Sequence, residues 1–245
     1  MQRSKLFYKL YRWIVYTKRS ITFKKYCLTE PLLEKTILFE SFQGRNYSCS
    51  PKAMFLEAVN NEKYKDYTFI WSVRNPKKYA FLKKYPNTKL IKYNTRGYLK
   101  VLATAKYWVT NSTMLTYVTP RKEQLFIQTW HGTPLKRLGC DLEVDEAKAQ
   151  SLSEIHEQYK NQGKKINIFL SPSKFYSEKI GSAYAQTAEQ IEEKFLECGY
   201  PRNDFLFSFT EDDVAAIRKK LNIPEGKKVL LYAPTFRDNT FERGK

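Results

Sequence analysis

One of the two histidines in this 245-residue chain stands where a strand should end and a loop should begin. His131 follows the apolar run 124–130 and opens a turn that contains Gly132, Thr133 and Lys136. Strand ends are where α/β enzymes place catalytic groups, and imidazole exchanges a proton near neutral pH. The pattern indicates His131 as a candidate general base. The alternative is a strand-end histidine that is hydrogen-bonded within its own loop.

Three further loops carry polar groups at expected element ends. The first loop follows a strand that ends near residue 40. Its Gly44 permits close backbone approach to a ligand, and its amides can face an anion. An ordinary turn is the alternative. Residues 198–204 are polar and rich in turn residues, as at a joint between domains. Residues 233–238 place a hydroxyl and a guanidinium after an apolar run, which suits a phosphate unless Arg237 simply pairs with Asp238.

The elements that must position these loops alternate between strand and helix. Short apolar runs predict strands at residues 36–40, 67–73, 89–93, 107–110, 125–130, 166–170 and 229–233. Capping signals and helical periodicity predict helices that start at Ser50-Pro51 and that cover about 76–85, 96–105, 145–161, 174–195 and 211–221. This alternation predicts an α/β fold with a mostly parallel sheet and helices on both faces.

Composition bounds the class of protein. Hydrophobic residues make up 42% and aromatic residues 16% of the chain, which excludes a disordered protein. The net charge of +18 is compatible with nucleic acid, anionic lipid or a polyanionic substrate. The four cysteines form no CxxC pair, which argues against a zinc site or disulfide framework and fits a reducing cytosol. No apolar run reaches the length of about 18 residues that spans a bilayer, and no signal peptide is recognisable.

The first 26 residues are basic and amphipathic. They contain eight basic residues and no acidic one: Arg3, Lys5, Lys9, Arg12, Lys18, Arg19, Lys24 and Lys25. Apolar residues recur between them every three or four positions, so a helix would gather them on one face. Such a helix suits the headgroup region of an anionic membrane, where each basic residue contributes about 1 kcal/mol. A solvated helix packed on its own domain is the alternative.

Taken together and in order, these stretches resemble the CDP-glycerol glycerophosphotransferase family, which builds teichoic acids and related wall or capsule polymers. The matching stretches are residues 40–44 with 47–48 and 51–53, 129–136 with Gly139 and Asp141, 171–173, 199–204 and 232–238. The Trp-His-Gly-Thr-Pro stretch around His131 is the most specific of them. The resemblance covers roughly residues 35–240.

The resemblance implies a GT-B-like architecture, with a Rossmann-like N-terminal domain followed by the start of a second α/β domain. We expect a membrane-associating segment at 1–26, an acceptor-side domain at 27–204 and the beginning of a donor-binding domain at 205–245. The family's later histidine-proline loop and Asp-Tyr-Ser-Ser-type stretch are missing from this sequence. We therefore expect a truncated second domain, a natural protein that continues, and a chain that is inactive alone.

The implied reaction transfers glycerol phosphate or ribitol phosphate from a CDP-alcohol to a lipid-linked polyprenyl disaccharide or a growing poly(alditol phosphate), and releases CMP. It would take place at the cytoplasmic face of the cell membrane, on a peripherally bound enzyme. His131 would act as the general base. The implied substrate-binding residues are Gly44, Gly132, Thr133, Lys136, Arg202, Asn203, Thr235, Arg237 and Asp238. We expect no metal and no cofactor besides the substrates.

Two other function classes stay open on the sequence alone. A GT-B sugar transferase that uses a nucleotide sugar would share the architecture. A non-catalytic fragment that binds membrane or nucleic acid would account for the charge, although no nucleic-acid-binding motif is present and we expect no nucleic-acid partner. The other histidine, His156, falls in a polar helical stretch and is expected at the surface. The sequence does not distinguish a glycerol donor from a ribitol donor, or a primase from a polymerase. It also does not give the oligomeric state.

Overall fold

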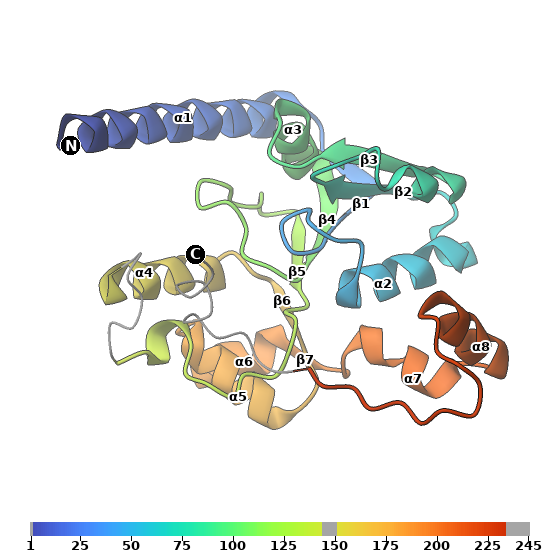
Figure 1. Cartoon of the computed structure of the whole chain (residues 1–245). Helices are drawn as coiled ribbons and strands as arrows, with labels where there is room; N and C mark the ends of the chain where they lie inside the picture. Colours follow the sequence, from blue (N-terminus) through green and yellow to red (C-terminus); the bar gives the residue numbers. More distant parts are fainter. Residues whose placement is uncertain (1, 144–150, 234–245) are drawn as a thin grey trace. The chain divides into compact units, whose positions relative to one another are not determined.

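The computed structural model of the chain describes residues 2–143 and 151–233. The chain divides into two compact units, residues 1–204 and 205–245, and each is described by itself. The first unit contains a seven-stranded sheet in the order β3-β2-β1-β4-β5-β6-β7 (Figure 1). Every neighbouring pair of strands in it is parallel. The expected α/β fold with a parallel sheet is confirmed.

Strands and helices alternate along the first unit. The strands are β1 (Leu33–Glu40), β2 (Thr68–Val73), β3 (Thr88–Lys92), β4 (Ala105–Thr110), β5 (Leu125–Gln128), β6 (Ile168–Ser171) and β7 (Phe195–Glu197). The α-helices are α1 (Gln2–Thr29), α2 (Cys49–Asn60), α3 (Arg96–Thr104), α4 (Leu152–Gly163), α5 (Lys174–Ala183) and α6 (Ala188–Lys194). Short 3-10 helices are η1 (Glu62–Tyr64), η2 (Ala80–Lys84), η3 (Gly139–Asp141) and η4 (Pro201–Asn203). The second unit contains α7 (Phe205–Ser208) and α8 (Glu211–Lys220).

The central strand β1 is packed on both faces. Its side chains alternate, as in any strand. Ile37 and Phe39 pack with Phe55 of α2 on one face, and Leu38 belongs to the cluster around Tyr98 of α3 on the other. Phe39, Phe55 and Tyr98 are each at most 1% exposed, and burying one such side chain contributes about 2–3 kcal/mol. The carboxyl end of β1 is therefore fixed between two cores.

Helix α2 and the segment 76–85 differ from the expected helices. Helix α2 begins at Cys49, so Ser50 lies within its first turn and is not the residue that caps it. Within the expected helix 76–85, residues 76–79 form a turn and Ala80–Lys84 form the 3-10 helix η2 in place of an α-helix. The Asn75 side chain accepts a backbone N–H at 3.1 Å and holds the start in a turn. Pro86 at the other end excludes the helical conformation for the residue before it.

Residues 174–195 form two helices instead of the single expected one. Ala185 takes a left-handed backbone conformation (φ 52) directly after α5. Thr187 then starts α6 with a capping box that it shares with Gln190. The chain continues into β7, which sequence periodicity missed and which pairs with β6 at the edge of the sheet.

The expected strand at residues 229–233 is wrong. These residues form no strand in the structure, and the Leu230 side chain is 96% exposed. A strand needs a neighbour for its backbone hydrogen bonds, and the described residues of the second unit contain only the helices α7 and α8. The expected helix at 211–221 is confirmed as α8, with Thr210 as its cap.

Helix α1 confirms the expected N-terminal helix, and its carboxyl-terminal half is anchored. Phe23 is 3% exposed within the core. The Arg121 guanidinium donates to the carbonyl oxygens of Tyr26 at 2.9 Å and Glu30 at 2.8 Å, which satisfies carbonyls that a helix end leaves unpaired. The amino-terminal half, by contrast, exposes Phe7 by 76% and Trp13 by 63%.

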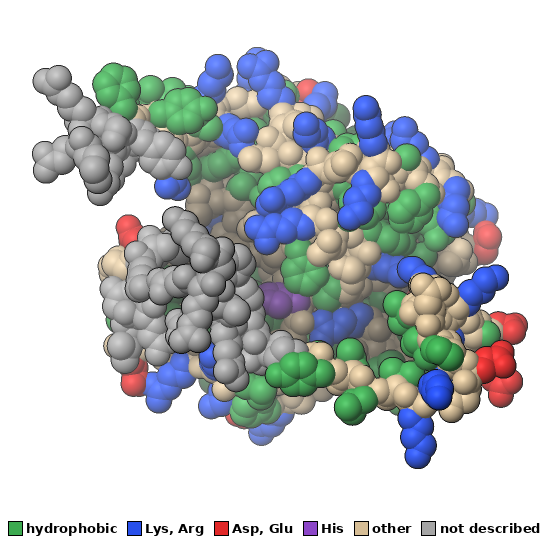
Figure 2. Space-filling view, viewed as in Figure 1, with side chains coloured by type: hydrophobic (Ala, Val, Ile, Leu, Met, Phe, Trp, Pro, Cys, Tyr) green, Lys and Arg blue, Asp and Glu red, His purple; other side chains and the backbone are tan. Residues whose placement is uncertain are grey.

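Basic side chains predominate over acidic ones on the face drawn in Figure 2. Among the described residues, none of the helices is both long enough and apolar enough to cross a membrane. The four cysteines are all free.

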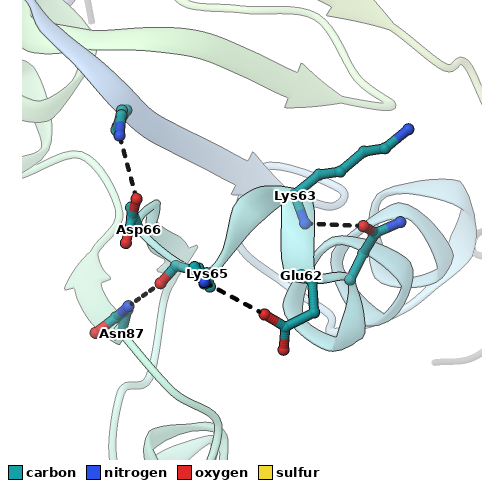
Figure 3. Close-up of polar contacts among 7 residues, drawn as sticks. Glu62, Lys63, Lys65, Asp66 and Asn87 are labelled. Carbon is teal, nitrogen blue, oxygen red and sulfur yellow. Dashed lines mark hydrogen bonds and ion pairs between the residues drawn. The ribbon is translucent and has the colours of Figure 1, made fainter.

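The amino-terminal edge of the sheet is tied by exposed polar contacts around η1 (Figure 3). Lys35 pairs with Asp66 at 3.3 Å and Lys65 pairs with Glu62 at 3.7 Å. The Asn87 side chain donates to the Lys65 carbonyl oxygen at 2.8 Å. Exposed ion pairs of this kind contribute at most about 1 kcal/mol each. The Lys35–Asp66 pair and the Asn87 bond tie the loop between α2 and β2 to β1 and to the residue before β3, and the Lys65–Glu62 pair lies within that loop.

A buried carboxyl group lies at the opposite edge. Glu40, the last residue of β1, is 2% exposed and is in register with Ser72 of β2 and Thr110 of β4. Burial raises the pKa of Glu40 from 4.5 to about 7, and the Ser72 and Tyr98 hydroxyls and the Arg74 charge offset this only in part.

We predict that Glu40→Gln flattens the pH dependence of stability. Between pH 4.5 and about 7 the native Glu40 holds a proton that the unfolded chain releases. The unfolding free energy therefore falls as pH rises through this range, by an amount on the order of 3 kcal/mol. Urea unfolding at pH 5 and pH 8 measures the decrease in unfolding free energy in the wild type and in Glu40→Gln. An equal fall in the variant would contradict the prediction, and the exposed Glu62→Gln serves as the control.

Candidate active site

The carboxyl-terminal edge of the sheet brings together loops that are distant in sequence. Strand β1 has β2 on one side and β4 on the other, so the order of strands along the chain reverses between β1 and β4. Ligands of open α/β sheets bind at such a reversal, outside the carboxyl ends of the strands. A pocket of about 280 Å³ lies among the loops that follow β1, β4 and β5. It is lined by Phe42, Gln43, Arg45, Ser112, Thr113, Trp130 and His131.

The His131 imidazole is held in one tautomer. Its Nδ1 lies 3.0 Å from the carbonyl oxygen of Asn111. A carbonyl oxygen only accepts hydrogen bonds, so Nδ1 carries the proton and Nε2 keeps a free lone pair. The Trp130 and Phe42 rings lie 4.3 Å and 5.7 Å from the imidazole, centroid to centroid. This arrangement gives His131 what a general base needs, an oriented ring with an accepting nitrogen.

A strained turn places His131 beyond the end of β5. The Gln128 side chain accepts a hydrogen bond from the Trp130 amide at 3.0 Å. Trp130 itself has a left-handed backbone conformation (φ 49) and is 8% exposed. Outside glycine that conformation costs about 1–2 kcal/mol and persists where the surroundings enforce it. Burial of the Trp130 side chain contributes to that enforcement.

Asn111, which the sequence analysis did not single out, joins the loop after β1 to the His131 loop. Its backbone oxygen accepts from His131, and its side-chain oxygen accepts the Phe42 amide at 2.8 Å. The neighbouring Ser112 hydroxyl accepts the Gln43 amide at 3.1 Å. Asn111 is fully buried. The available signal was an Asn-Ser-Thr sequence directly after an expected strand.

The loop after β1 is a tight left-handed turn. Phe42, Gln43 and Gly44 have consecutive positive φ values of 48, 54 and 73. The Gly44 carbonyl oxygen accepts the Arg74 amide at 2.7 Å, and the Arg74 side chain donates to the Gln43 carbonyl oxygen at 3.0 Å. Because the Phe42 and Gln43 amides bind Asn111 and Ser112, they do not face an anion as the sequence suggested.

The loop at 198–204 also contacts the His131 loop. Arg202 Nη1 donates to the His131 carbonyl oxygen at 2.7 Å and lies 3.2 Å from the Cys49 thiol. The Arg202 guanidinium also lies over the Tyr200 ring, 4.6 Å from its centroid. The Tyr200 hydroxyl in turn bonds to the Thr133 hydroxyl at 3.0 Å. Arg202 and Thr133 thus hold protein groups in place.

The other expected site residues fall in different places. Gly132 sits in the His131 loop with open space around it, and Asn203 is the last residue of η4. Lys136 lines a separate pocket of about 520 Å³ together with Lys179. Thr235, Arg237 and Asp238 lie outside the described residues.

His156 is half-buried, and its Nε2 donates to the Leu142 carbonyl oxygen at 3.0 Å. It is thus less exposed than its polar surroundings in the sequence indicated. Within residues 2–143 and 151–233, no cluster of three or more His, Cys, Asp or Glu side chains could hold a metal ion.

A parallel α/β sheet with an oriented histidine at its strand reversal has the arrangement in which α/β proteins bind their ligands. The chain belongs to the CDP-glycerol:poly(glycerophosphate) glycerophosphotransferase family, whose model matches residues 22–245. The resemblance inferred from the sequence is confirmed.

Relatives and solved structures agree with this family. The chain is 36% identical over 98% of its length to a teichoic acid poly(glycerol phosphate) polymerase of Bacillus spizizenii, and spans 59% of that protein. It is 30% identical over 94% of its length to a teichoic acid glycerol-phosphate transferase of Staphylococcus aureus, and spans 56% of it. The wall teichoic acid polymerase TagF superposes with a TM-score of 0.78 at 32% identity, over 98% of this chain and 58% of TagF. The GT-B-like fold class is confirmed.

We predict that Gly44→Ala destabilises the protein by about 2 kcal/mol or more, because of strain and overpacking. An added Cβ would keep the strained φ of +73 and lie 2.9 Å from the Tyr93 Cβ. Gly132→Ala is the matched control, since its Cβ would meet nothing within 4 Å. Urea unfolding of both variants measures the difference. Equal stability of the two variants would show that the turn after β1 does not require glycine.

Proposed function

We propose that the protein transfers glycerol phosphate from CDP-glycerol to a poly(glycerol phosphate) acceptor and releases CMP. Membership of the family supports this donor over a nucleotide sugar. The names of the relatives favour glycerol phosphate over ribitol phosphate. The observation that carries the proposal is the His131 imidazole, held by Asn111 at the reversal of the sheet. The chain spans about 59% of the length of its B. spizizenii relative.

In the proposed reaction, the terminal hydroxyl of the acceptor gives its proton to Nε2 of His131. The hydroxyl oxygen attacks the β-phosphorus of CDP-glycerol. The bond from that phosphorus to the bridging oxygen breaks, and CMP leaves with the bond electrons. Transfer of this kind depends on alignment of nucleophile and leaving group and on neutralisation of phosphate charge. Basic side chains supply that neutralisation in the proposal.

The expected binding residues divide between two sides of the reaction. We assign Thr235 and Arg237 to the donor pyrophosphate. Asp238 is assigned to substrate binding beside them, in the donor-binding domain that begins within residues 205–245. The acceptor side is assigned to the domain 27–204, with Gly44, Gly132, Thr133, Lys136, Arg202 and Asn203. Arg202 and Thr133 contribute by holding the His131 loop, as their hydrogen bonds indicate. Lys136 contributes a positive charge to the pocket beyond that loop.

We also propose that the basic segment 1–26 binds the cytoplasmic face of the cell membrane and brings the site to a lipid-linked acceptor. The exposed Phe7, Leu10 and Trp13 side chains of α1 support this, together with the absence of acidic residues in the segment. Aromatic and aliphatic groups beside lysine and arginine are what an interfacial helix needs.

We predict that His131→Gln lowers CMP release from CDP-glycerol by about 10²- to 10⁴-fold, the usual contribution of a general base. His156→Gln is the control, because glutamine can still donate to the Leu142 carbonyl oxygen that His156 binds. The assay uses the complete natural protein with a poly(glycerol phosphate)-primed acceptor. Near-normal turnover by the His131 variant would remove this residue from the mechanism.

We predict that Trp13→Ala weakens binding to phosphatidylglycerol vesicles by about tenfold or more, because an inserted tryptophan contributes about 1.5–3 kcal/mol. Flotation of the chain with vesicles measures the binding. Phe81→Ala is the control, since Phe81 is a 49% exposed aromatic residue of η2, away from the helix. Equal binding by wild type and the Trp13 variant, or equal binding to phosphatidylcholine, would contradict the proposed membrane contact.

A further inference from the structure

The pocket beside His131 contains a cation that the reaction described so far does not use. Arg45 lines this pocket and its side chain is exposed. Among the described residues it makes no ion pair, and no carboxylate is among the residues that line the pocket. An exposed guanidinium in a concave wall without a counter-charge suits a phosphate, which it binds with two parallel hydrogen bonds.

The segment after β4 supplies hydroxyl groups to the same pocket. Ser112 and Thr113 follow β4 and line the same pocket. The Ser112 oxygen already accepts the Gln43 amide at 3.1 Å. A serine hydroxyl that accepts one hydrogen bond keeps its own proton to donate. The wall therefore offers donors, which an anion needs.

The pocket is an open hollow of about 280 Å³, near the lower end of the roughly 300–1,000 Å³ that encloses drug-sized ligands. This space accommodates one glycerol phosphate unit. His131 and Arg45 both lie on its wall, so a polyol phosphate in it would meet a base at one point and a cation at another.

We propose that Arg45, with Ser112 and Thr113, binds the phosphate of the acceptor's last glycerol phosphate unit, whose free hydroxyl reacts at His131. The inference rests on the proposed function and adds to it a subsite that binds the terminal unit of the acceptor. Phosphate and reacting hydroxyl are separated by the three carbons of one glycerol. The subsite therefore selects chains that end in glycerol phosphate over chains that end in a neutral polyol.

Backbone contacts make Arg45 a suitable position for substitution. Its amide donates to the Phe42 carbonyl oxygen at 3.2 Å, and its own carbonyl oxygen accepts the Tyr79 hydroxyl at 2.9 Å. Both bonds survive a change of side chain. Arg45→Gln removes the charge. Arg45→Lys keeps the charge but lacks the planar guanidinium group that makes two parallel hydrogen bonds. Lys83→Gln is the matched control, since it removes one exposed charge from η2.

The first experiment measures KM for both substrates in the complete natural protein. We expect Arg45→Gln to raise KM for a poly(glycerol phosphate)-primed acceptor by about tenfold or more, the usual effect of a lost charged hydrogen bond. Arg45→Lys should have an intermediate effect, and KM for CDP-glycerol should stay within about twofold. If KM for CDP-glycerol rises instead, Arg45 binds the donor and the proposal is overturned. Unchanged values for both substrates would also overturn the proposal.

The second experiment separates the subsite from the reaction. Ring signals of the two histidines are followed by NMR in this chain while glycerol 3-phosphate, glycerol or inorganic phosphate is added. We expect glycerol 3-phosphate to shift the His131 signal, to leave His156 unchanged and to lose its effect in Arg45→Gln. If this chain shows these shifts but the protein assayed in the first experiment releases no CMP from CDP-glycerol, the subsite stands and the proposed function fails. If glycerol shifts His131 as strongly as glycerol 3-phosphate does, the phosphate subsite fails.

Discussion

Asn111 makes the hydrogen bonds on which the geometry of the site depends. One residue at the end of β4 holds the His131 ring through its backbone oxygen and the loop after β1 through its side chain. Asn111 is fully buried and its partners are part-buried, so water competes less for these bonds than for fully exposed ones. Without the first bond, the imidazole could rotate and take either tautomer. Without the second, the loop that carries Arg45 would be tied to the segment after β4 by one hydrogen bond fewer, with the bond from the Gln43 amide to Ser112 remaining.

The strain in these loops is balanced by the packing beneath them. Phe42, Gln43 and Trp130 all occupy the left-handed backbone region without being glycine. Such positions are stable only where neighbouring structure enforces them. Here the enforcement comes from the two aromatic cores that hold β1 between α2 and α3. The result is a set of loops whose polar groups are already oriented, and such an arrangement reduces the ordering that binding of a ligand requires.

The sequence predicts local features of this protein well and long-range ones poorly. The strand before His131 and its polar turn follow from an apolar run and from Gly, Thr and Pro, so the candidate base was recognisable. The role of Asn111 was not, because it depends on β1 and β5 lying on either side of β4. The helix and strand errors have the same origin. Residues 195–197 become a strand because β6 is beside them, whereas residues 229–233 have no such neighbour within the described part of the second unit. Arg202 has the residue type of a ligand contact, yet it binds protein groups.

Helix α1 also fixes a distance. It has 28 residues, which at 1.5 Å per residue is about 42 Å. Arg121 holds its carboxyl-terminal end against the first unit, so the helix is a spacer of set length between that end and whatever holds its first turns. Inserting or deleting one residue would change this spacing by about 1.5 Å and would also rotate the exposed aromatic side chains by about 100° around the axis. Length and rotational phase in α1 are therefore coupled, and only changes of whole turns would alter the reach of the helix while preserving the direction in which it presents Trp13.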